Sequence, residues 1–306
     1  MSLNEEVDIT LQQFVRNSGF ANSGGVITDL DGTAVHEHQG RIVIPKEVEL
    51  GLLRHYQSGR PIVINSLRFP LSVLRTFGQD WYKLSNAPIP TVTLNGSLIG
   101  YINQAGEGEL AFEEVAAFPL KGEEINEAME GVQGLLQGGI KNLLVFYYPR
   151  DWRIGEVIWT PVPENVIPVK EKYLSASAVT AVEFPKLIAQ MLEEDICMIF
   201  LLIDAPEDQL MAYQHTKRSN FITHKGVDKL FGARAMANAI KFELSDSLGA
   251  GDTELDSFLS GVGLAVIVGS NSLDFRGVRG TIKLPSSREL GTLLFRASDL
   301  AGDKTQ

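Results

Sequence analysis

Short apolar runs alternate along the chain with stretches of helical spacing. Runs of the right length for a buried strand lie at 25–28, 61–64, 143–148, 154–159, 196–203 and 265–268. Apolar residues spaced along one helix face predict helices over 45–58, 122–136, 182–192, 228–240 and 254–259. Strands that alternate with helices are typical of a parallel sheet with crossover helices, so we expect an α/β fold.

The first two strands and the helix between them form a predicted βαβ unit. Pro45 suits the first turn of that helix, and Gly59 suits a left-handed cap at its end. Both strands deliver polar residues at their carboxyl ends, Asp29 after the first and Ser66 after the second. Ligands of open α/β sheets bind at this edge, so we expect a site there.

The middle of the chain is interpreted as a second unit. The stretch 92–102 favours a hairpin around Asn95-Gly96, and Gly106–Gly108 is interpreted as a linker. The segment before Gly25 is amphipathic in part and is assigned no role. We divide the chain into a core of 1–104 and 219–306 and an inserted α/β unit of 105–218.

The composition is that of an ordinary globular protein with an acidic balance. Of 306 residues, 44% are hydrophobic and 21% are charged, which is enough apolar material for a substantial core. The formal net charge is −11 and no basic cluster interrupts it, so we expect no nucleic-acid partner. The one cysteine, Cys197, excludes a disulfide scaffold and suits a small core residue.

Neither a membrane span nor a targeting segment is predicted. The longest strongly apolar run, Ile196–Ile203, is bounded by Asp195 and Asp204 and is too short to cross a bilayer. The start, Met1 to Glu6, is acidic and lacks the basic-then-apolar order of a signal peptide. We expect a soluble, cytoplasmic protein without a membrane partner, present as a monomer or a homodimer.

Two carboxylates after the first strand are the most informative residues. They occur in Asp29-Leu30-Asp31-Gly32-Thr33, where Gly32 supplies a backbone conformation that other residues resist. In such a pair one carboxylate can attack as a nucleophile while the other acts as general acid and then as base. A surface turn is the alternative, because Asp and Gly both favour turns.

Two further stretches carry groups that suit a phosphoryl ligand. Ser66, with Arg68 close behind it, can hold phosphoryl oxygens at a strand end. Lys229, or Lys225 before it, can neutralise negative charge at the start of a helix. Each signal is weak alone, because serines are common at strand ends and most lysines are solvated.

The last candidate is the acidic stretch Gly251-Asp252-Thr253-Glu254-Leu255-Asp256. We interpret 249–252 as a glycine-rich turn, preceded by a strand that is unusually polar at 243–247. Carboxylate oxygens of this kind suit Mg²⁺. An acidic first turn that complements a helix dipole is the alternative interpretation.

These elements together resemble the haloacid dehalogenase (HAD) superfamily of phosphohydrolases, and within it the Cof-like branch. Their order is strand and Asp-x-Asp, strand and Ser, a long insertion, Lys and helix, then Gly-Asp-x-x-x-Asp. Leu94-Asn95-Gly96 and Val268-Gly269-Ser270-Asn271 resemble two further turns of that branch. The resemblance implies a doubly wound parallel-sheet (Rossmann-like) core with a smaller inserted α/β cap.

The resemblance also implies roles for single residues. Asp29 would be the nucleophile that forms an aspartyl-phosphate, and Asp31 would be the general acid and base. Ser66 would bind phosphoryl oxygens, and Lys229 would stabilise the charge around Asp29. The implied Mg²⁺ ligands are the Asp29 carboxylate, the Asp31 backbone carbonyl and Asp252, with Asp256 behind them. Arg68 and Asn95 would contact the substrate.

Some residues depart from the branch or invite another interpretation. Leu67 replaces the glycine of the usual Thr-Gly-Arg, and Leu255 stands where an asparagine usually precedes the last aspartate. His36-Glu37-His38 fits a solvated loop better than a transition-metal site. The cap aromatics fit core packing better than sugar stacking; these are Tyr147, Tyr148, Trp152 and Trp159.

The activity implied is a Mg²⁺-dependent phosphomonoesterase that hydrolyses small phosphorylated metabolites, sugar phosphates first, because a cap excludes macromolecules. A phosphomutase or phosphotransferase would use the same aspartate pair. A sugar-phosphate-binding regulator without turnover is the third alternative. Leu67 and Leu255 favour it, whereas Asp31 argues against it, since a binder needs no general acid.

Overall fold

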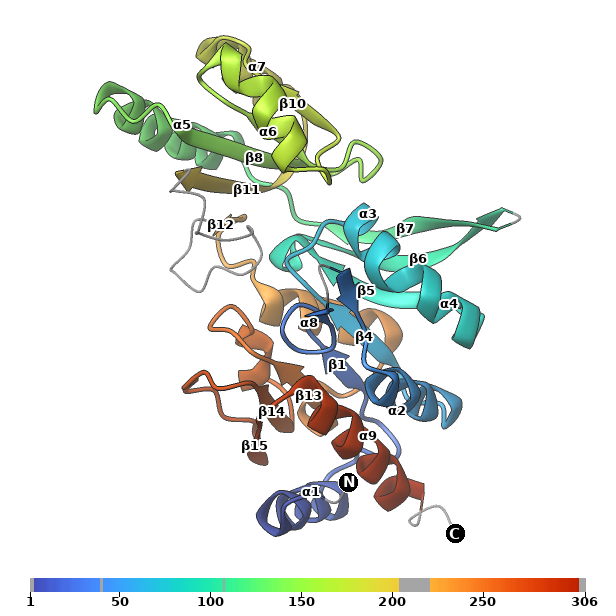
Figure 1. The fold of residues 1–306 in the computed structure, drawn as a ribbon. Coiled ribbons are helices and arrows are strands. Elements are labelled where there is room, and N and C mark those ends of the chain that lie inside the picture. The colour runs from blue at the N-terminus through green and yellow to red at the C-terminus, as the bar shows by residue number, and fades with distance from the viewer. Residues whose placement is uncertain (1–2, 39–40, 107, 204–220, 303–306) are drawn as a thin grey trace.

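The larger of two sheets forms the core of the protein. The structure is a computed structural model that describes residues 3–38, 41–106, 108–203 and 221–302. In the described residues this sheet has eight strands, in the order β15 (Gly280–Leu284), β14 (Leu264–Val268), β13 (Leu248–Gly251), β1 (Val26–Thr28), β4 (Ile62–Asn65), β5 (Ile89–Thr93), β6 (Leu98–Gly106) and β7 (Glu109–Ala117). From β15 to β5 all neighbours are parallel, while β6 and β7 are antiparallel (Figure 1).

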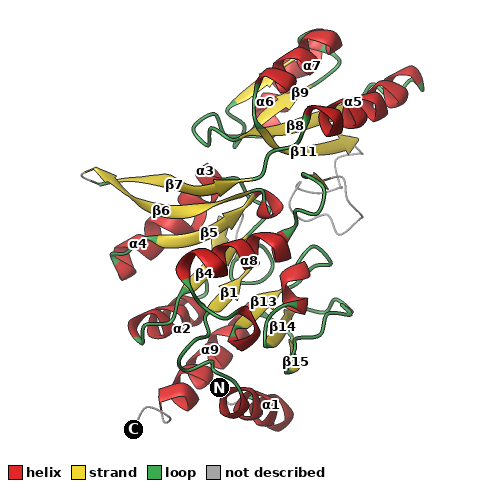
Figure 2. Cartoon of the chain, turned by 180° about the vertical axis from the view of Figure 1, so that it is seen from behind, coloured by secondary structure: helices red, strands yellow, loops and turns green. Residues whose placement is uncertain are grey.

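Helices cover both faces of this sheet (Figures 1 and 2). One face packs against α1 (Glu5–Asn17), α2 (Lys46–Gln57), α4 (Gln79–Ser85) and α9 (Ser287–Gly302), with α3 (Pro70–Val73) leading into α4. The other face packs against α8 (Lys229–Ile240) and the 3₁₀ turn Ser257–Ser260. Within β1, Val26 belongs to the first core cluster and Ile27 to the second, as the alternation of a strand requires. The sheet is doubly wound, as predicted.

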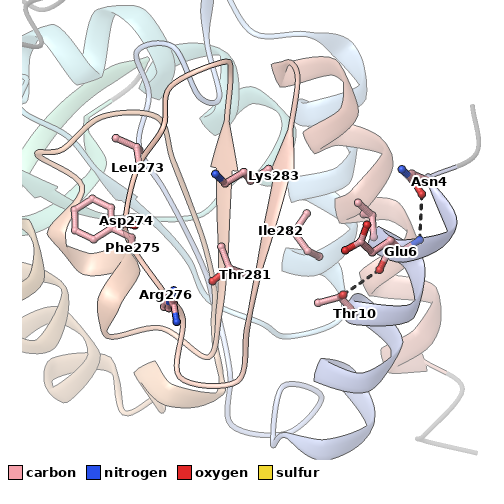
Figure 3. Close-up of a pocket in the computed structure, with 11 residues that line it drawn as sticks. Asn4, Glu6, Thr10, Leu273, Asp274, Phe275, Arg276, Thr281, Ile282 and Lys283 are labelled. Carbon is pink, nitrogen blue, oxygen red and sulfur yellow. Dashed lines mark hydrogen bonds between the residues drawn. The ribbon is translucent and has the colours of Figure 1, made fainter.

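The N-terminal helix α1 is part of this core. The side chain of Asn4 caps it by accepting a hydrogen bond from the Glu6 amide at 3.1 Å (Figure 3). Phe14 is buried, and Asp8 pairs with Arg296 of α9 at 2.8 Å. Helix α1 therefore closes the edge of the core beside β15, a role that its partly amphipathic sequence left open.

The second sheet forms the inserted unit, which we call the cap. In the described residues it has five strands, in the order β10 (Ala178–Thr180), β9 (Val157–Trp159), β8 (Leu143–Pro149), β11 (Ile196–Ile203) and β12 (Phe221–Ile222). Helices α5 (Gly122–Gln137) and α7 (Phe184–Glu193) pack on one face, and α6 (Val166–Lys172) contributes Val169 to the cluster on the other. The predicted α/β core with an inserted α/β unit is confirmed.

The cap touches the core directly after Ser66. The Phe69 ring of the core lies 5.7 Å from the Tyr148 ring of the cap. Arg150 of the cap makes a 2.7 Å ion pair with Glu114 of β7. Core packing is confirmed for Cys197 and for three of the cap aromatics, which are buried: Tyr147, Tyr148 and Trp159. These contacts place the cap over the carboxyl edge of the core sheet (Figure 1).

The interpretation of Gly106–Gly108 as a linker is wrong. Gly106 ends β6 and pairs with Glu109 at the start of β7, so both residues belong to neighbouring strands of the core sheet. Glycines serve flexible linkers and tight turns alike, which is why the sequence misplaced β7 in the 105–218 unit. The other predicted boundary, between 218 and 219, lies outside the described residues.

Three further expectations near Asp252 are wrong. Gly249–Gly251 belong to β13 and are not a turn, because small residues let the strand approach its neighbours closely; a Cβ on Gly249 would lie 2.9 Å from Val262. The polar stretch 243–247 is no strand but contains the 3₁₀ turn Leu244–Asp246. In place of helix 254–259 there is only the 3₁₀ turn Ser257–Ser260.

A short antiparallel pair, β2 (His36–His38) and β3 (Arg41–Val43), follows Asp31. His36-Glu37-His38 is thus part of a strand and not a loop, and its side chains lie outside what the structure describes. None of the helices in the described part of the chain is long and apolar enough to cross a membrane.

Candidate active site

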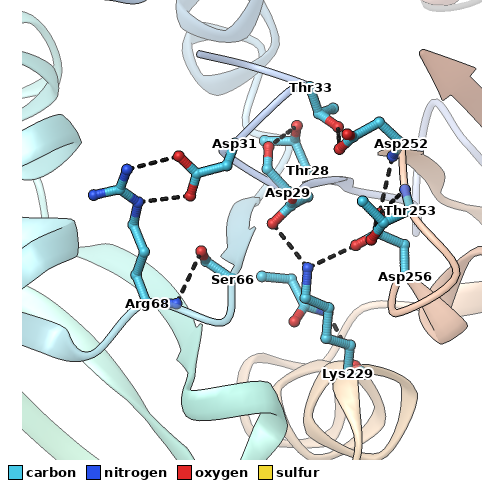
Figure 4. A network of polar contacts seen from close by, with 11 residues as sticks. Thr28, Asp29, Asp31, Thr33, Ser66, Arg68, Lys229, Asp252, Thr253 and Asp256 are labelled. Carbon is cyan, nitrogen blue, oxygen red and sulfur yellow. Dashed lines mark hydrogen bonds and ion pairs between the residues drawn. The ribbon is translucent and has the colours of Figure 1, made fainter. Parts of the chain in front are cut away.

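The carboxyl ends of three adjacent strands bring the predicted residues together (Figure 4). Thr28 at the end of β1 pairs in register with Ile64 of β4 and with Ala250 of β13. The amide of Asp29 continues the ladder by donating to the carbonyl of Ala250 at 2.9 Å. The residues that follow these strands therefore face one another across the edge of the sheet.

Lys229 joins two carboxylates at the centre of the site. Its Nζ donates to Oδ1 of Asp29 at 2.8 Å and to Oδ1 of Asp256 at 2.6 Å. All three residues are buried, with Lys229 1% exposed and Asp29 5% exposed. The surface-turn alternative for Asp29 is therefore excluded, as is the exposed Lys225 as the cation of this array.

Local structure explains why Lys229 points there. Asp228 caps α8 by accepting from the Phe231 amide at 2.8 Å, which places Lys229 in the first helical turn. The side-chain amide of Asn65 donates to the Lys229 carbonyl at 2.9 Å and is fully buried. Sequence reasoning gave Asn65 no role; a buried asparagine at the end of an apolar strand is the signal that could have found it.

The loop after β13 is held by Asp256. Its Oδ2 accepts from the amides of Asp252 and Thr253, both at 2.9 Å. A Cβ on Gly251 would lie 2.7 Å from this carboxyl group, so the loop can close only over glycine. With Oδ1 bound to Lys229, both oxygens of Asp256 are used within the protein. Asp256 therefore shapes the loop and orients Lys229.

Asp252 reaches across to the segment that follows β1. Its Oδ1 accepts from Oγ1 of Thr33 at 2.7 Å. Gly32 between the two has φ +78°, and a Cβ there would lie 2.2 Å from the other Asp252 oxygen. Glycine is thus required at position 32 both for the backbone conformation and for the approach of Asp252. Asn271 supports the same loop by donating to the Asp252 carbonyl at 2.9 Å.

The site carries more negative than positive charge. One carboxylate oxygen from each of Asp29, Asp252 and Asp256 lies within 4.8 Å of the other two, and Lys229 is the cation that the described residues place among them. Burial, and then the neighbouring carboxylates, raise the pKa of Asp252 to about 7. Burial also raises the pKa of Asp29 well above its ordinary value, against the opposing effect of Lys229.

Lys229 remains charged in this setting. Burial alone would lower its pKa, but the charges of Asp256 and Asp29 and the hydrogen bonds to both raise it above the ordinary value. Its ammonium group is therefore a fixed positive charge beside Asp29.

The Asp31 side chain forms an ion pair with Arg68. Arg68 donates from Nε and Nη2 to the two Asp31 oxygens, both at 2.6 Å, and from Nη1 to Ser72 at 2.8 Å. Bidentate pairs of this kind fix geometry as well as charge. The guanidinium is buried while the Asp31 side chain is 23% exposed, so Asp31 borders solvent.

Ser66 and Asn95 are both buried. Oγ of Ser66 accepts from the Arg68 amide at 3.2 Å, so Leu67 in the glycine position leaves the turn intact. Asn95 has φ 56° in a turn that packs on the start of α8, where a Cβ on Gly96 would lie 2.1 Å from the Asp228 carbonyl. The side-chain Oδ1 of Asn95 has no hydrogen-bond partner among the described residues.

The fold has many relatives among solved structures. A HAD subclass IIB sugar phosphatase aligns with a TM-score of 0.61 at 17% identity, covering 89% of this chain and 96% of that one. A phosphatase of the same superfamily from Bacteroides thetaiotaomicron aligns at 0.62 and 16% identity, with 92% and 96% covered. A protein from Plasmodium vivax described as a HAD/Cof-like hydrolase aligns at 0.65 and 17% identity, with 95% and 99% covered.

The chain has the HAD fold of subclass IIB. In sequence, no protein-family model matches it and no curated protein matches significantly. At identities of 16 to 18% the shared property is the fold, so the chemistry has to be argued from this chain's own side chains.

The HAD fold brings most of the predicted residues to one place. Asp29, Lys229, Asp252 and Asp256 form a contiguous polar array, and Asp31, Ser66 and Arg68 form a second array beside it (Figure 4). Sequence reasoning missed the Thr33 hydroxyl on Asp252 and the Asn65 amide on the Lys229 carbonyl. It also assigned Arg68 to the substrate, whereas the structure pairs Arg68 with Asp31.

Proposed function

We propose that this protein is a Mg²⁺-dependent phosphomonoesterase that hydrolyses a small phosphorylated metabolite through an aspartyl-phosphate on Asp29. The observation that carries the proposal is the buried Asp29–Lys229–Asp256 array with Asp252 beside it, at the carboxyl edge of the sheet. Asp31 lies two residues from the nucleophile and supplies an acid–base group, which a purely binding protein would not need.

The side chains present fit Mg²⁺. The donors offered at the site are carboxylate oxygens, which hard cations prefer. Within the described residues, two buried carboxylates and the half-buried carboxylate of Asp252 are grouped around one lysine, and a bound dication would balance the remaining charge. We assign the Asp29 carboxylate, the Asp31 backbone carbonyl and Asp252 as the residues that hold it. When bound, Mg²⁺ supplies charge neutralisation between Asp29 and a phosphate dianion.

In the first step an oxygen of the Asp29 carboxylate attacks phosphorus, and the bond from phosphorus to the alcohol oxygen breaks. Asp31, protonated, gives its proton to the leaving alcohol. Lys229 and Ser66 stabilise the negative charge on the transferring group, the first as a fixed cation and the second as a hydroxyl donor. The products are the free alcohol and an acyl phosphate on Asp29.

In the second step Asp31, now a carboxylate, takes a proton from water. The water oxygen attacks phosphorus, the bond between phosphorus and the Asp29 oxygen breaks, and inorganic phosphate leaves. In the structure Arg68 donates to both oxygens of the Asp31 side chain. We infer that Arg68 moves from Asp31 toward the substrate when a phosphate dianion enters, which frees Asp31 to carry a proton.

Two observations support a small substrate, sugar phosphates first. The cap touches the core directly after Ser66 through Phe69 and Tyr148, which limits access for a macromolecule. A solved structure with the same fold is a sugar phosphatase.

The test is phosphate release from a panel of phosphorylated metabolites and p-nitrophenyl phosphate. Each is assayed with Mg²⁺, with EDTA, and with the Asp29→Asn variant. Release that requires both Mg²⁺ and Asp29 supports the proposal and ranks the substrates. No release from the folded, Mg²⁺-loaded protein supports a binding protein without turnover. Transfer of phosphate to an added sugar in place of water identifies a phosphotransferase.

A further inference from the structure

A second hollow lies at the opposite end of the core strands. It has a volume of about 710 Å³ and is lined by residues that precede β1, β4 and β5, together with the end of α2 and the residues after α8. Pro61 enters β4 here, whereas Ser66 leaves β4 at the candidate active site. At 3.3 Å per residue the five positions between them span about 16 Å, so the two sites are separate.

The lining of this hollow has an unusual charge. It includes Arg60 and Lys241, and none of the described residues that line it is an aspartate or glutamate, although the chain has a net charge of −11. The hollow between α1 and β15 is the contrast, because there Arg276 and Lys283 are accompanied by Glu6 and Asp274 (Figure 3).

Arg60 is the distinctive group of the site. It is 6% exposed, and it forms no ion pair with a carboxylate among the described residues. Its Nε donates to the Phe20 carbonyl at 3.3 Å, Nη1 donates to the hydroxyl of Ser58, and the guanidinium lies 5.1 Å from the Phe20 ring centroid. Burial accordingly lowers the pKa of Arg60 from its ordinary value. A buried guanidinium without a counterion favours binding of an anion from solution.

The rest of the lining is suited to an apolar group. The rings of Tyr56 and Trp81 lie 6.4 Å apart in an edge-on arrangement, and Pro61 and Pro88 line the same hollow. Tyr56 is half-buried, so part of its ring faces the hollow or solvent. Such surfaces bury the flat face of a ring while a charged group is held elsewhere.

We propose that this hollow is a second ligand site, which binds a small anion carrying an aromatic group, with Arg60 as its anchor and Lys241 as a supporting cation at the rim. The anionic group takes the place of the missing carboxylate beside Arg60. The ring lies against Tyr56 and Pro61. This inference does not depend on phosphatase activity.

The experiment is an NMR titration with benzenesulfonate, which has no phosphoryl group and so is no substrate of the candidate active site. Benzenesulfonamide is the matched neutral probe. The indole N–H signal of Trp81 reports the hollow, and those of Trp152 and Trp159 report the cap. We expect a saturable shift of the Trp81 signal alone, with benzenesulfonamide at least about tenfold weaker.

Single substitutions test which positive charge binds benzenesulfonate. Arg60→Met should weaken benzenesulfonate binding by at least about tenfold. Lys241→Glu, at an exposed position, should weaken it about threefold or more. Arg276→Met, in the hollow of Figure 3, and Asp29→Asn should leave it unchanged.

Three results would overturn the proposal. One is the absence of a Trp81 shift at millimolar benzenesulfonate, and another is equal binding of the sulfonamide. The third is unchanged affinity in Lys241→Glu, which decides the question even if Arg60→Met fails to fold.

Discussion

Lys229 Nζ lies 2.8 Å from Oδ1 of Asp29, although the two residues are 200 positions apart in the chain. Asp256 holds the ammonium group from the other side at 2.6 Å, and all three are buried. A lysine held between two buried carboxylates cannot move far without leaving charge unpaired. Lys229 is therefore a preorganised positive charge, which is the property that charge stabilisation in a phosphoryl transfer requires.

Removing the positive charge of Lys229 should lower kcat, while the protein should still bind its substrate. Lys229→Met keeps much of the side-chain volume and should lower kcat by about 10²–10³-fold, because the transferring phosphoryl group loses its fixed cation. Steady-state kinetics with p-nitrophenyl phosphate measure the change. Lys225→Met, an exposed lysine four residues earlier, is the matched control and should keep wild-type kcat.

Asp31→Asn should separate the two chemical steps. The nitrophenolate leaving group needs little protonation, so Asp29 should still be phosphorylated, whereas water attack should stall without the base. Stopped-flow absorbance should show a burst of about one nitrophenol per enzyme followed by slow turnover. Equal slowing of the burst and the later phase would assign Asp31 to another role.

The affinity for Mg²⁺ should depend on Asp252 and not on the nearby Glu254. In Asp252→Asn the Mg²⁺ concentration for half-maximal activity should rise at least about tenfold, because a charged oxygen donor is lost. Glu254→Gln, an exposed position in the same loop, should leave it unchanged. If the Mg²⁺ concentration for half-maximal activity rises similarly in both variants, the negative charge of the loop attracts the ion and Asp252 is not a ligand.

Gly32 should not tolerate a side chain. Gly32→Ala adds a Cβ that would lie 2.2 Å from an Asp252 oxygen, at a φ of +78° that alanine resists. We expect a loss of activity of more than about tenfold with a higher Mg²⁺ requirement, since Asp252 must move. Gly59→Ala is the control for φ alone, because its φ is +81° and, apart from its chain neighbours, no described residue has an atom within 4 Å of the added Cβ.

Acid stability should depend on His55, remote from the candidate site. His55 is buried, and burial, together with the charge of Arg60, lowers its pKa to about 3 from an ordinary 6.5. Above pH 6.5 the ring is neutral in both the folded and unfolded states. Between pH 6.5 and 3 only the unfolded state binds the proton, so stability falls as the pH falls, by several kcal/mol.

Urea unfolding from pH 7 to pH 4 checks this expectation. His55→Gln removes the titrating group. The free energy of unfolding should then fall less steeply with falling pH, by the contribution of about one proton. A variant that loses stability with pH as steeply as the wild type would show that other groups control acid unfolding.

The sequence predicted the parts of this protein that are set by local pattern. The buried runs that became β1 and β4 and the polar residues after them needed only strand periodicity and the rule for parallel sheets. Asp29 and Lys229 were paired by resemblance, and the geometry places them in contact.

Two of the errors came from glycines whose role is decided by packing at a distance. Gly106 ends a core strand because β7 pairs with it, and Gly249 is in a strand because Val262 packs closely on it. Neither contact has a local signature. The Asp31–Arg68 pair likewise depends on how the segment after β1 is placed against the segment after β4. The spacing of residues along the chain does not predict that placement.

The most direct test of the central claim is to identify the residue that carries the phosphoryl group. The Asp31→Asn variant is mixed with p-nitrophenyl phosphate and Mg²⁺, quenched in acid within the burst, and digested for mass spectrometry. We predict the added mass of one phosphoryl group on Asp29, and none in the Asp29→Asn, Asp31→Asn double variant. A phosphoryl group on another residue, or turnover by Asp29→Asn alone, would contradict the account.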